Sequence, residues 1–192
     1  MQSRRQRDER VVARRYPREL EQRVKLHGTS IMLRPIRVTD TRAYLRFIAG
    51  SDPSDVRRRF ETLTCKDLVR YARSIDYDRD MAFVATAAGT GGEREIIGDV
   101  RIFTYPDDAT AEFALLIRSD MQRRGLGRAL LEKAIDYCRT RGHRVLIGQI
   151  SPENEPMIAL ARRSGMEVEQ APGSSLAVAH LDLQPDRAEH QR

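Results

Sequence analysis

The sequence predicts an α/β protein, an α+β arrangement in which helices pack on a mixed β-sheet. Three observations predict this class. The chain has 192 residues, enough for one domain with a sizeable core. Its composition, 40% hydrophobic and 32% charged, is that of a globular protein. Apolar runs of strand length also alternate along the chain with segments of helical period, the pattern of a sheet covered by helices.

Caps, breakers and turns place the elements of the first half. Small polar residues cap helices, glycine and proline end them, and a glycine-rich turn between two alternating runs indicates a hairpin. The predicted elements are a strand at 31–36, a helix at 41–49 capped by Asp40 and ended by Gly50 and Pro53, a helix at 64–75 that opens with a capping box, and a hairpin of strands at 81–88 and 94–103.

The same rules place the elements of the second half. Gly142 and Gly165 end helices, while Asn154 with Pro156 opens one. The predicted elements are a strand at 111–118, a helix from 125 to about 141, a buried strand at 144–150, a helix at 157–165, and a last pair of strands at 166–170 and 176–183.

Charge and composition limit the partners and the setting. The net charge is +6, and arginines crowd the first 25 residues, where Tyr16 is the one aromatic residue; this does not favour a nucleic-acid partner. No apolar run approaches the ~20 residues of a membrane span, and the N-terminus does not resemble a signal peptide. Cys65, Cys138 and the four scattered histidines have no metal-ligand spacing, so no metal is expected. We expect a cytoplasmic protein.

One segment suggests a binding site. In MQRRGLGRALLEKAI (121–135), two glycines and several arginines stand where a helix begins. The first N–H groups of a helix lack partners within it, and its dipole places roughly +0.5 charge there. Glycine lets an anion approach the backbone, and Arg123, Arg124 and Arg128 add charge. Taken alone, Gly-x-Gly is a weak signal, because a flexible turn explains it equally well and the known nucleotide fingerprints do not fit.

The context of this turn resembles the GNAT acetyltransferase family. QRRGLG lies between a strand and a helix, and a later strand is followed by the pattern N-x-x-x-x-A-x-x-x-G, over most of the chain from Arg34 to Leu183. The resemblance implies the GNAT fold, a mostly antiparallel sheet flanked by helices, and acetyl-CoA as acyl donor. It also implies a coenzyme site in which the strand residues accept the pantetheine arm and the turn binds the pyrophosphate: Leu115, Leu116, Ile117, Gln122, Arg123, Arg124, Gly125, Leu126, Gly127, Arg128 and Asn154.

A closer resemblance concerns the acceptor. LRPI, YDRDMAFVA, AEFALLIRSD and MIALARRSGM are similar to the catalytic domain of Pat-type bacterial protein lysine acetyltransferases, which modify acyl-CoA synthetases. It implies a protein substrate with an acceptor lysine, an acyl-CoA synthetase for example. We expect a basic, partly disordered extension at 1–27, the acetyltransferase domain at 28–184 and a tail at 185–192. The regulatory domain common in that group is expected to be absent or supplied by another chain.

Acetyl transfer needs a neutral amine. A free lysine has a pKa near 10.4, so a general base within hydrogen-bond reach is needed at neutral pH. Glu112 is the candidate: it shares a strand face with Ala114 and Leu116, whose small or apolar side chains favour the protonated form of a carboxyl. A solvated strand glutamate is the alternative, and the resemblance favours the base because AEFA carries the catalytic glutamate of the Pat group.

The general acid is less defined. Many GNAT enzymes have a tyrosine where this chain has Ala161, but a thiolate of pKa near 8.5 can leave without full protonation. Two other functions stay open at this stage. One is an N-acetyltransferase for small amines, and the other is a non-catalytic acetyl-CoA-binding regulator.

Overall fold

The computed structural model describes residues 15–59, 77, 80–89 and 92–184. This part of the chain contains one eight-stranded sheet in the order β1-β2-β3-β4-β5-β6-β8-β7. Neighbouring strands are antiparallel except β5 and β6, which run parallel, so the predicted mixed sheet is confirmed. The strands are β1 (Gln22–Leu26), β2 (Thr29–Pro35), β3 (Asp80–Ala88), β4 (Arg94–Thr104), β5 (Thr110–Ile117), β6 (Val145–Ile150), β7 (Glu167–Glu169) and β8 (Ala177–Asp182).

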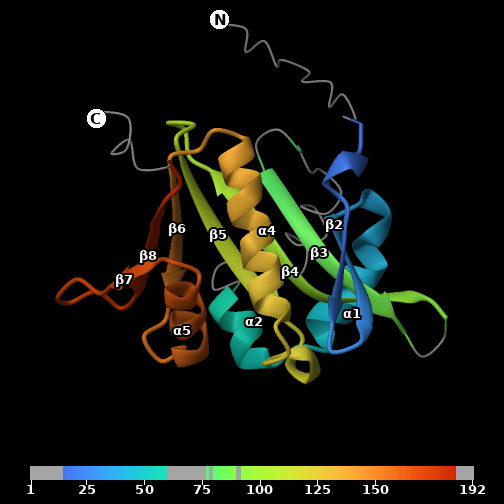
Figure 1. Ribbon diagram of the computed structural model, residues 1–192. Coiled ribbons are helices and arrows are strands. Elements are labelled where there is room, and N and C mark those ends of the chain that lie inside the picture. The colour runs from blue at the N-terminus through green and yellow to red at the C-terminus, as the bar shows by residue number, and fades with distance from the viewer. Residues whose placement is uncertain (1–14, 60–76, 78–79, 90–91, 185–192) are drawn as a thin grey trace, which may run out of the picture.

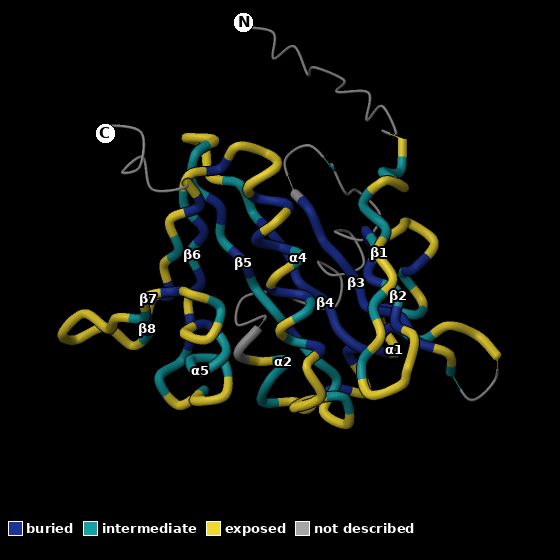
Figure 2. The backbone as a smooth tube through the Cα atoms, viewed as in Figure 1, coloured by how far each residue is buried: buried dark blue, intermediate teal, exposed yellow. Residues whose placement is uncertain are grey.

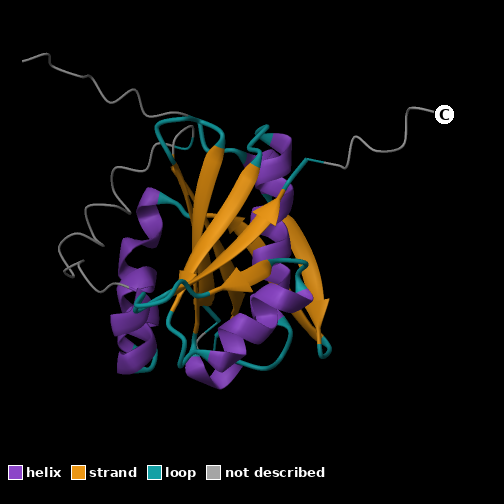
Figure 3. Cartoon of the chain, turned by 90° about the vertical axis from the view of Figure 1, so that its left-hand side faces the viewer, coloured by secondary structure: helices purple, strands orange, loops and turns teal. Residues whose placement is uncertain are grey.

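Helices cover both faces of the sheet (Figure 1, Figure 3). On one face, α1 packs on β4 and α2 on β5, while α4 lies on β3, β4 and β5 from the other face. Next to α4 on that second face, α5 packs on β7 and β8. The helices are α1 (Thr41–Ala49), α2 (Pro53–Arg59), α4 (Leu126–Thr140) and α5 (Glu155–Arg163), with 3₁₀ turns η1 (Arg18–Leu20), η2 (Val38–Asp40) and η3 (Ser119–Met121).

The two faces carry two hydrophobic clusters, which strand alternation separates. In β5, Ala111 and Phe113 are buried in the larger cluster with α4, whereas Leu116 is buried in the smaller cluster with Tyr44 and Phe47 of α1. The middle of α4 and the central strands are buried, and exposure increases toward the sheet edges (Figure 2). Residues at even positions of β5 from 112 to 116 therefore face α1 and α2.

Most predicted elements are found within a residue or two, and two details were wrong. Pro53, expected only to end a helix, begins α2, where the fixed φ of proline suits a first turn. Asp40 makes no side-chain cap on α1. Its carboxylate instead accepts two hydrogen bonds from the Arg34 guanidinium, at 2.6 and 2.8 Å, and one from the Arg37 N–H at 2.7 Å. The predicted helix at 64–75 lies outside the described residues.

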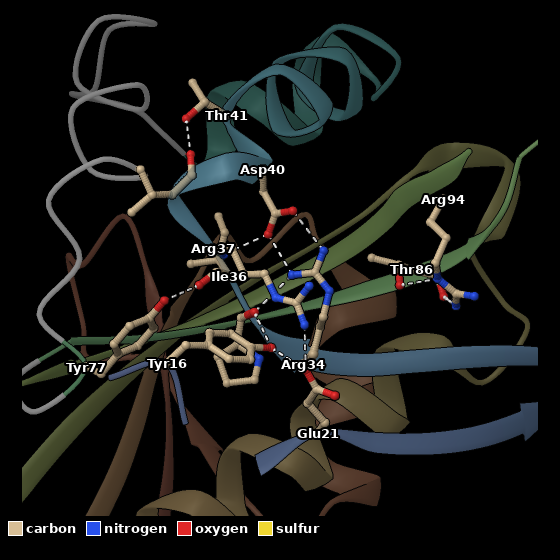
Figure 4. Close-up of polar contacts among 12 residues, drawn as sticks. Tyr16, Glu21, Arg34, Ile36, Arg37, Asp40, Thr41, Tyr77, Thr86 and Arg94 are labelled. Carbon is tan, nitrogen blue, oxygen red and sulfur yellow. Dashed lines mark hydrogen bonds and ion pairs between the residues drawn. The ribbon is translucent and has the colours of Figure 1, made fainter. Parts of the chain in front are cut away.

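The predicted boundary of the N-terminal extension at residue 27 was also wrong in part. Residues 22–26, which were assigned to the extension, form β1 and pair with β2. Tyr16, further upstream, is held in a polar cluster (Figure 4). Its hydroxyl donates to Glu21 Oε1 at 2.8 Å, and the Arg37 guanidinium stacks 4.5 Å from its ring centroid. The Tyr77 ring meets it edge-on at 6.2 Å. The folded unit therefore reaches back at least to Tyr16.

The ends of the described chain share one end of the sheet. The chain enters at residue 15 and leaves at residue 184 there, whereas α4 begins at the opposite end (Figure 1). The exit is fixed beside the start of β6, because the Leu183 N–H donates to the Arg144 carbonyl at 2.8 Å. Both ends of the described chain thus lie away from the first turn of α4.

Candidate active site

The sheet opens between its two parallel strands. β5 and β6 pair over three positions, Thr110 to Glu112 against Val145 to Ile147, although β5 continues to Ile117 and β6 to Ile150. The two strands therefore part directly after Glu112. This splay gives the second half of β5 a backbone edge that β6 does not cover.

Two predicted pantetheine contacts lie on that edge, and one does not. The Arg118 N–H donates to the Ile97 carbonyl of β4 at 3.1 Å. In a strand, the N–H and C=O of one residue point to one side and those of the next residue to the other. Leu116 therefore also directs its N–H and C=O to β4, while Leu115 and Ile117 direct theirs to the open edge. The predicted main-chain contact of Leu116 with the pantetheine arm was therefore wrong, because its N–H and C=O face β4. Its side chain is buried against α1.

The turn before α4 exposes its backbone at the end of this edge. Gly125 is the N-cap residue with φ of +79°, and Arg123 also has a left-handed φ of +57°. An L-residue rarely adopts such a φ, which explains a glycine at 125. Residues 122–125 are exposed, and the first N–H groups of α4 have no acceptor within the helix. An anion placed here meets both the N–H groups and the positive end of the helix dipole.

Gly127 has a packing role that differs from the expected one. A Cβ added there would lie 3.2 Å from Leu160 Cδ2 and within 3.8 Å of the Leu115 and Ile117 side chains. The small residue thus lets the first turn of α4 approach β5 and α5 closely. Of the two glycines, Gly125 is needed for the backbone conformation and Gly127 for this approach.

Two of the polar residues predicted to bind the coenzyme, Gln122 and Arg128, already have side-chain contacts. The Gln122 amide donates to Asp55 of α2 at 2.9 Å and to the Ile117 carbonyl at 3.2 Å. Arg128 pairs with Glu132 at 2.7 Å in an exposed i,i+4 bridge, which is worth little and easily exchanged. The remaining arginine of interest, Arg124, is exposed and lines a small pocket of about 60 Å³ together with Leu26, His27, Thr29, Ile31, Met121 and Leu126.

Asn154 stands at the start of α5. Its Oδ1 accepts the Met157 N–H at 3.3 Å, so the predicted helix cap is confirmed. This bond uses the side-chain oxygen and leaves the amide nitrogen as the group that could reach a ligand. The role of Asn154 toward the coenzyme stays a prediction, as do those of Leu126 and the other residues of the turn.

Glu112 is half-buried on the α1–α2 face, at the point where β5 and β6 part. The Tyr105 hydroxyl donates to Glu112 Oε2 at 2.8 Å. This hydrogen bond, followed by burial, raises the pKa of Tyr105 above its usual value. Sequence reasoning missed Tyr105. The contact follows from the hairpin register of the structure, in which Phe103 pairs with Glu112 and Tyr105 lies diagonally across from it.

A buried polar cluster lies beside Glu112 on β4. Arg101 and Asp99 are 1% and 0% exposed, with 3.4 Å between Arg101 Nε and Asp99 Oδ2. The Tyr44 hydroxyl donates to Asp99 at 3.0 Å and accepts from Arg101 at 2.8 Å. Because the ions are paired within this cluster, it supports the floor of the α1–α2 face rather than presenting a charge to a ligand.

Two further observations concern the described residues only. They contain no group of three or more histidine, cysteine, aspartate or glutamate side chains placed to hold a metal ion. None of their helices has both the length and the apolar character that a membrane span requires.

The open β5 edge and the start of α4 together suit a long ligand with an anionic part, as a coenzyme with a phosphate group and a flexible arm would be. The family description "Acetyltransferase (GNAT) domain" matches residues 30–167. An acetyltransferase of Pseudomonas aeruginosa strain PAO1 is 30% identical over 156 residues, which cover 80% of this chain and 83% of that relative. The chain therefore belongs to the GNAT family: it is an acetyltransferase, and the family implies acetyl-CoA as donor.

Solved structures agree with this fold. The GNAT domain of S. lividans PAT has a TM-score of 0.77 and 26% identity, covering 88% of this chain and 99% of that one. An N-acetyltransferase from Staphylococcus aureus has a TM-score of 0.64 at 19% identity, covering 80% and 99%. A cAMP-binding acyltransferase from Mycobacterium smegmatis has a TM-score of 0.59 at 21% identity. The match covers 90% of this chain and 50% of that one. The last two likenesses show the fold alone.

One relative carries a named small-molecule activity. The L-methionine sulfoximine/L-methionine sulfone acetyltransferase of Pseudomonas aeruginosa strain PAO1 is 36% identical over 59 residues, 31% of this chain and 34% of that protein.

Proposed function

We propose that the protein transfers the acetyl group of acetyl-CoA to a lysine side chain of a protein substrate, with Glu112 as general base. The observation that carries this proposal is the position of Glu112 at the point where β5 and β6 part. A coenzyme held at the start of α4 and extended along the open edge of β5 would bring its thioester toward this carboxylate. The acceptor, a protein lysine, for example in an acyl-CoA synthetase, follows from the sequence resemblance to Pat-type acetyltransferases, and the likeness of the fold to the GNAT domain of S. lividans PAT is consistent with it.

The chain's residues divide the chemistry between them. The backbone at Gly125 and the neighbouring arginines hold the diphosphate, and the peptide groups of Leu115 and Ile117 align the pantetheine arm. The amine nitrogen attacks the thioester carbonyl carbon, forming the C–N bond as the C–S bond breaks. Coenzyme A leaves as its thiolate, and the proton released from the amine passes to Glu112, directly or through one water. Ala161, fully buried, supplies no acid for the thiolate.

Labelled acetyl-CoA, an acyl-CoA synthetase and a panel of free amines test this proposal. We expect label on lysine side chains, and a loss of at least about 100-fold in kcat for Glu112→Gln, which keeps the shape of the side chain but cannot accept the proton. Glu167→Gln is the matched control, since Glu167 is an exposed strand glutamate on β7. Unchanged kcat in Glu112→Gln would remove this residue as the base.

A small amine is the second candidate acceptor, favoured by the likeness to the methionine sulfoximine/sulfone acetyltransferase. Turnover on free amino acids with no labelling of protein would establish it. Binding of acetyl-CoA without turnover on any amine would instead support a regulator.

A further inference from the structure

Tyr105 has no role in the function proposed above, although its hydroxyl touches the candidate base. Tyr105 is 37% exposed and follows β4 in the turn that leads to β5. It lies on the same sheet face as Glu112. The donor in the 2.8 Å bond is the tyrosine hydroxyl, and the acceptor is Glu112 Oε2. A hydroxyl donor stabilises the ionised carboxylate, which is the form a general base needs.

The backbone around Tyr105 is firmly held. Its N–H donates to the Thr110 carbonyl, and its carbonyl accepts the Asp108 N–H, each at 2.9 Å. Within the turn, the Asp107 carboxylate accepts three hydrogen bonds, from the Ala109 N–H and from the N–H and hydroxyl of Thr110. These bonds lower the pKa of Asp107, so its carboxylate stays ionised and keeps these hydrogen bonds at a pH well below neutral.

The turn is also tied to β6, on the far side of Glu112. The Ala109 carbonyl accepts the Arg144 N–H at 2.8 Å and the Val145 N–H at 3.2 Å. Buried His143 adds a contact of 3.2 Å between its Nδ1 and the Asp108 carbonyl. The backbone of Tyr105 is thus held relative to the two strands that part at Glu112, and its hydroxyl is bonded to Glu112.

Other ionisable groups on this face are placed differently. Arg101 of β4, two positions along from Phe103, is held in the buried cluster with Asp99 and Tyr44. From α2, Asp55 is bonded to Gln122 at the other end of β5. Among the described side chains, Tyr105 makes the direct hydrogen bond to Glu112.

We propose that Tyr105 is a positioning residue for Glu112: it holds the carboxylate through Oε2 and directs Oε1 to the amine. This inference rests on the proposed function, because it needs Glu112 to act as the base. Tyr105 itself touches neither acceptor nor coenzyme in this scheme. Loss of its hydroxyl should therefore slow the transfer step and leave coenzyme binding intact.

Carboxyl NMR tests the inference without relying on turnover. Protein labelled with ¹³C in the glutamate side-chain carboxyls gives the Glu112 resonance, assigned by its loss in Glu112→Gln. In Tyr105→Phe we expect this resonance to move, since the carboxylate loses its hydroxyl donor. Tyr16→Phe is the matched control: it removes a hydroxyl-to-carboxylate bond of the same 2.8 Å length, between Tyr16 and Glu21, away from the site.

Kinetics with acetyl-CoA and poly-L-lysine supply the second readout. Tyr105→Phe should lower kcat about three- to tenfold, with KM for acetyl-CoA unchanged. An unchanged Glu112 resonance together with an unchanged kcat in Tyr105→Phe would overturn the positioning role. Full turnover by Glu112→Gln would remove the base, and the role of Tyr105 with it, whatever the spectrum shows.

Discussion

The environment of the Glu112 side chain depends on its hydrogen bond from Tyr105 and on the register in which β4 pairs with β5. Strand alternation, readable from the sequence, places Glu112 with Ala114 and Leu116 on one face. The contact with Tyr105 depends on which residues pair across the 105–110 turn, and a single sequence does not fix that register. Leu116 illustrates the same limit, because the direction of its peptide group follows from the pairing with β4 rather than from its apolar side chain.

Cys138 gives a prediction at the residue scale. Burial raises the pKa of this thiol from about 9 to about 12. Below pH 9 the thiol is protonated in both the folded and the unfolded chain, so its stabilising contribution is fully present. Between pH 9 and 12 only the unfolded chain ionises, so that contribution falls by up to about 1.4 kcal/mol per pH unit.

Urea unfolding of wild type and Cys138→Ala at pH 8, 9, 10 and 11 measures this effect. The variant will start less stable, because it loses a buried sulfur atom. Its free energy of unfolding should then decline less steeply above pH 9 than that of wild type. Parallel declines in the two proteins would contradict the assigned burial of the thiol.

At the scale of elements, local signals predicted what local interactions decide. Asn154, Gly142 and the 125–141 run gave α4 and α5 with nearly correct limits, because caps and helical period act within a few residues. The two elements that sequence reasoning missed have weaker local signals. In β1 the polar positions alternate with Val24 and Leu26, which pack on the core, and α2 is a two-turn helix rich in arginine.

The start of the folded unit is testable by truncation. Removal of residues 1–27 deletes β1, the packing of Val24 and Leu26, and the Tyr16 contacts, and it leaves β2 as an edge strand. We expect a loss of about 3 kcal/mol in the free energy of unfolding from these two apolar side chains alone, and a tendency to aggregate. Removal of residues 1–14 keeps every one of these contacts and serves as the control. Equal stability of the two truncated proteins would restore the boundary at residue 28.

At the scale of the whole molecule, the sheet consists of two parts joined at β5 and β6. The parts meet over three residue pairs, and α4 and α5 touch where Gly127 lies next to Leu160. The sequence predicted both strands, but the length of their pairing depends on contacts between distant segments. Gly148 shows one of them: a Cβ there would lie 2.3 Å from the Phe113 ring, so only glycine accommodates this ring at the splay.

Coenzyme A should hold the two parts together. At a concentration about 100 times its Kd, a ligand specific for the folded state adds about 2.7 kcal/mol, which for a domain of this size raises Tm by roughly 5–10 °C. 3′-Phosphoadenosine 5′-diphosphate keeps the diphosphate of coenzyme A but lacks the pantetheine arm, and so cannot run along the edge of β5; we expect a smaller shift with it. Differential scanning calorimetry compares the two ligands. Identical shifts would argue against a pantetheine arm lying between the strands.

The placement of the chain ends has a practical consequence. Because the described chain begins and ends at the end of the sheet away from the first turn of α4, an affinity handle joined directly to residue 15 or residue 184 starts away from the turn that we propose binds the coenzyme (Figure 1). A protein trimmed to residues 15–184 can therefore be immobilised on a sensor surface through either end and still present that turn to solution, so the coenzyme affinities measured in the two orientations should agree.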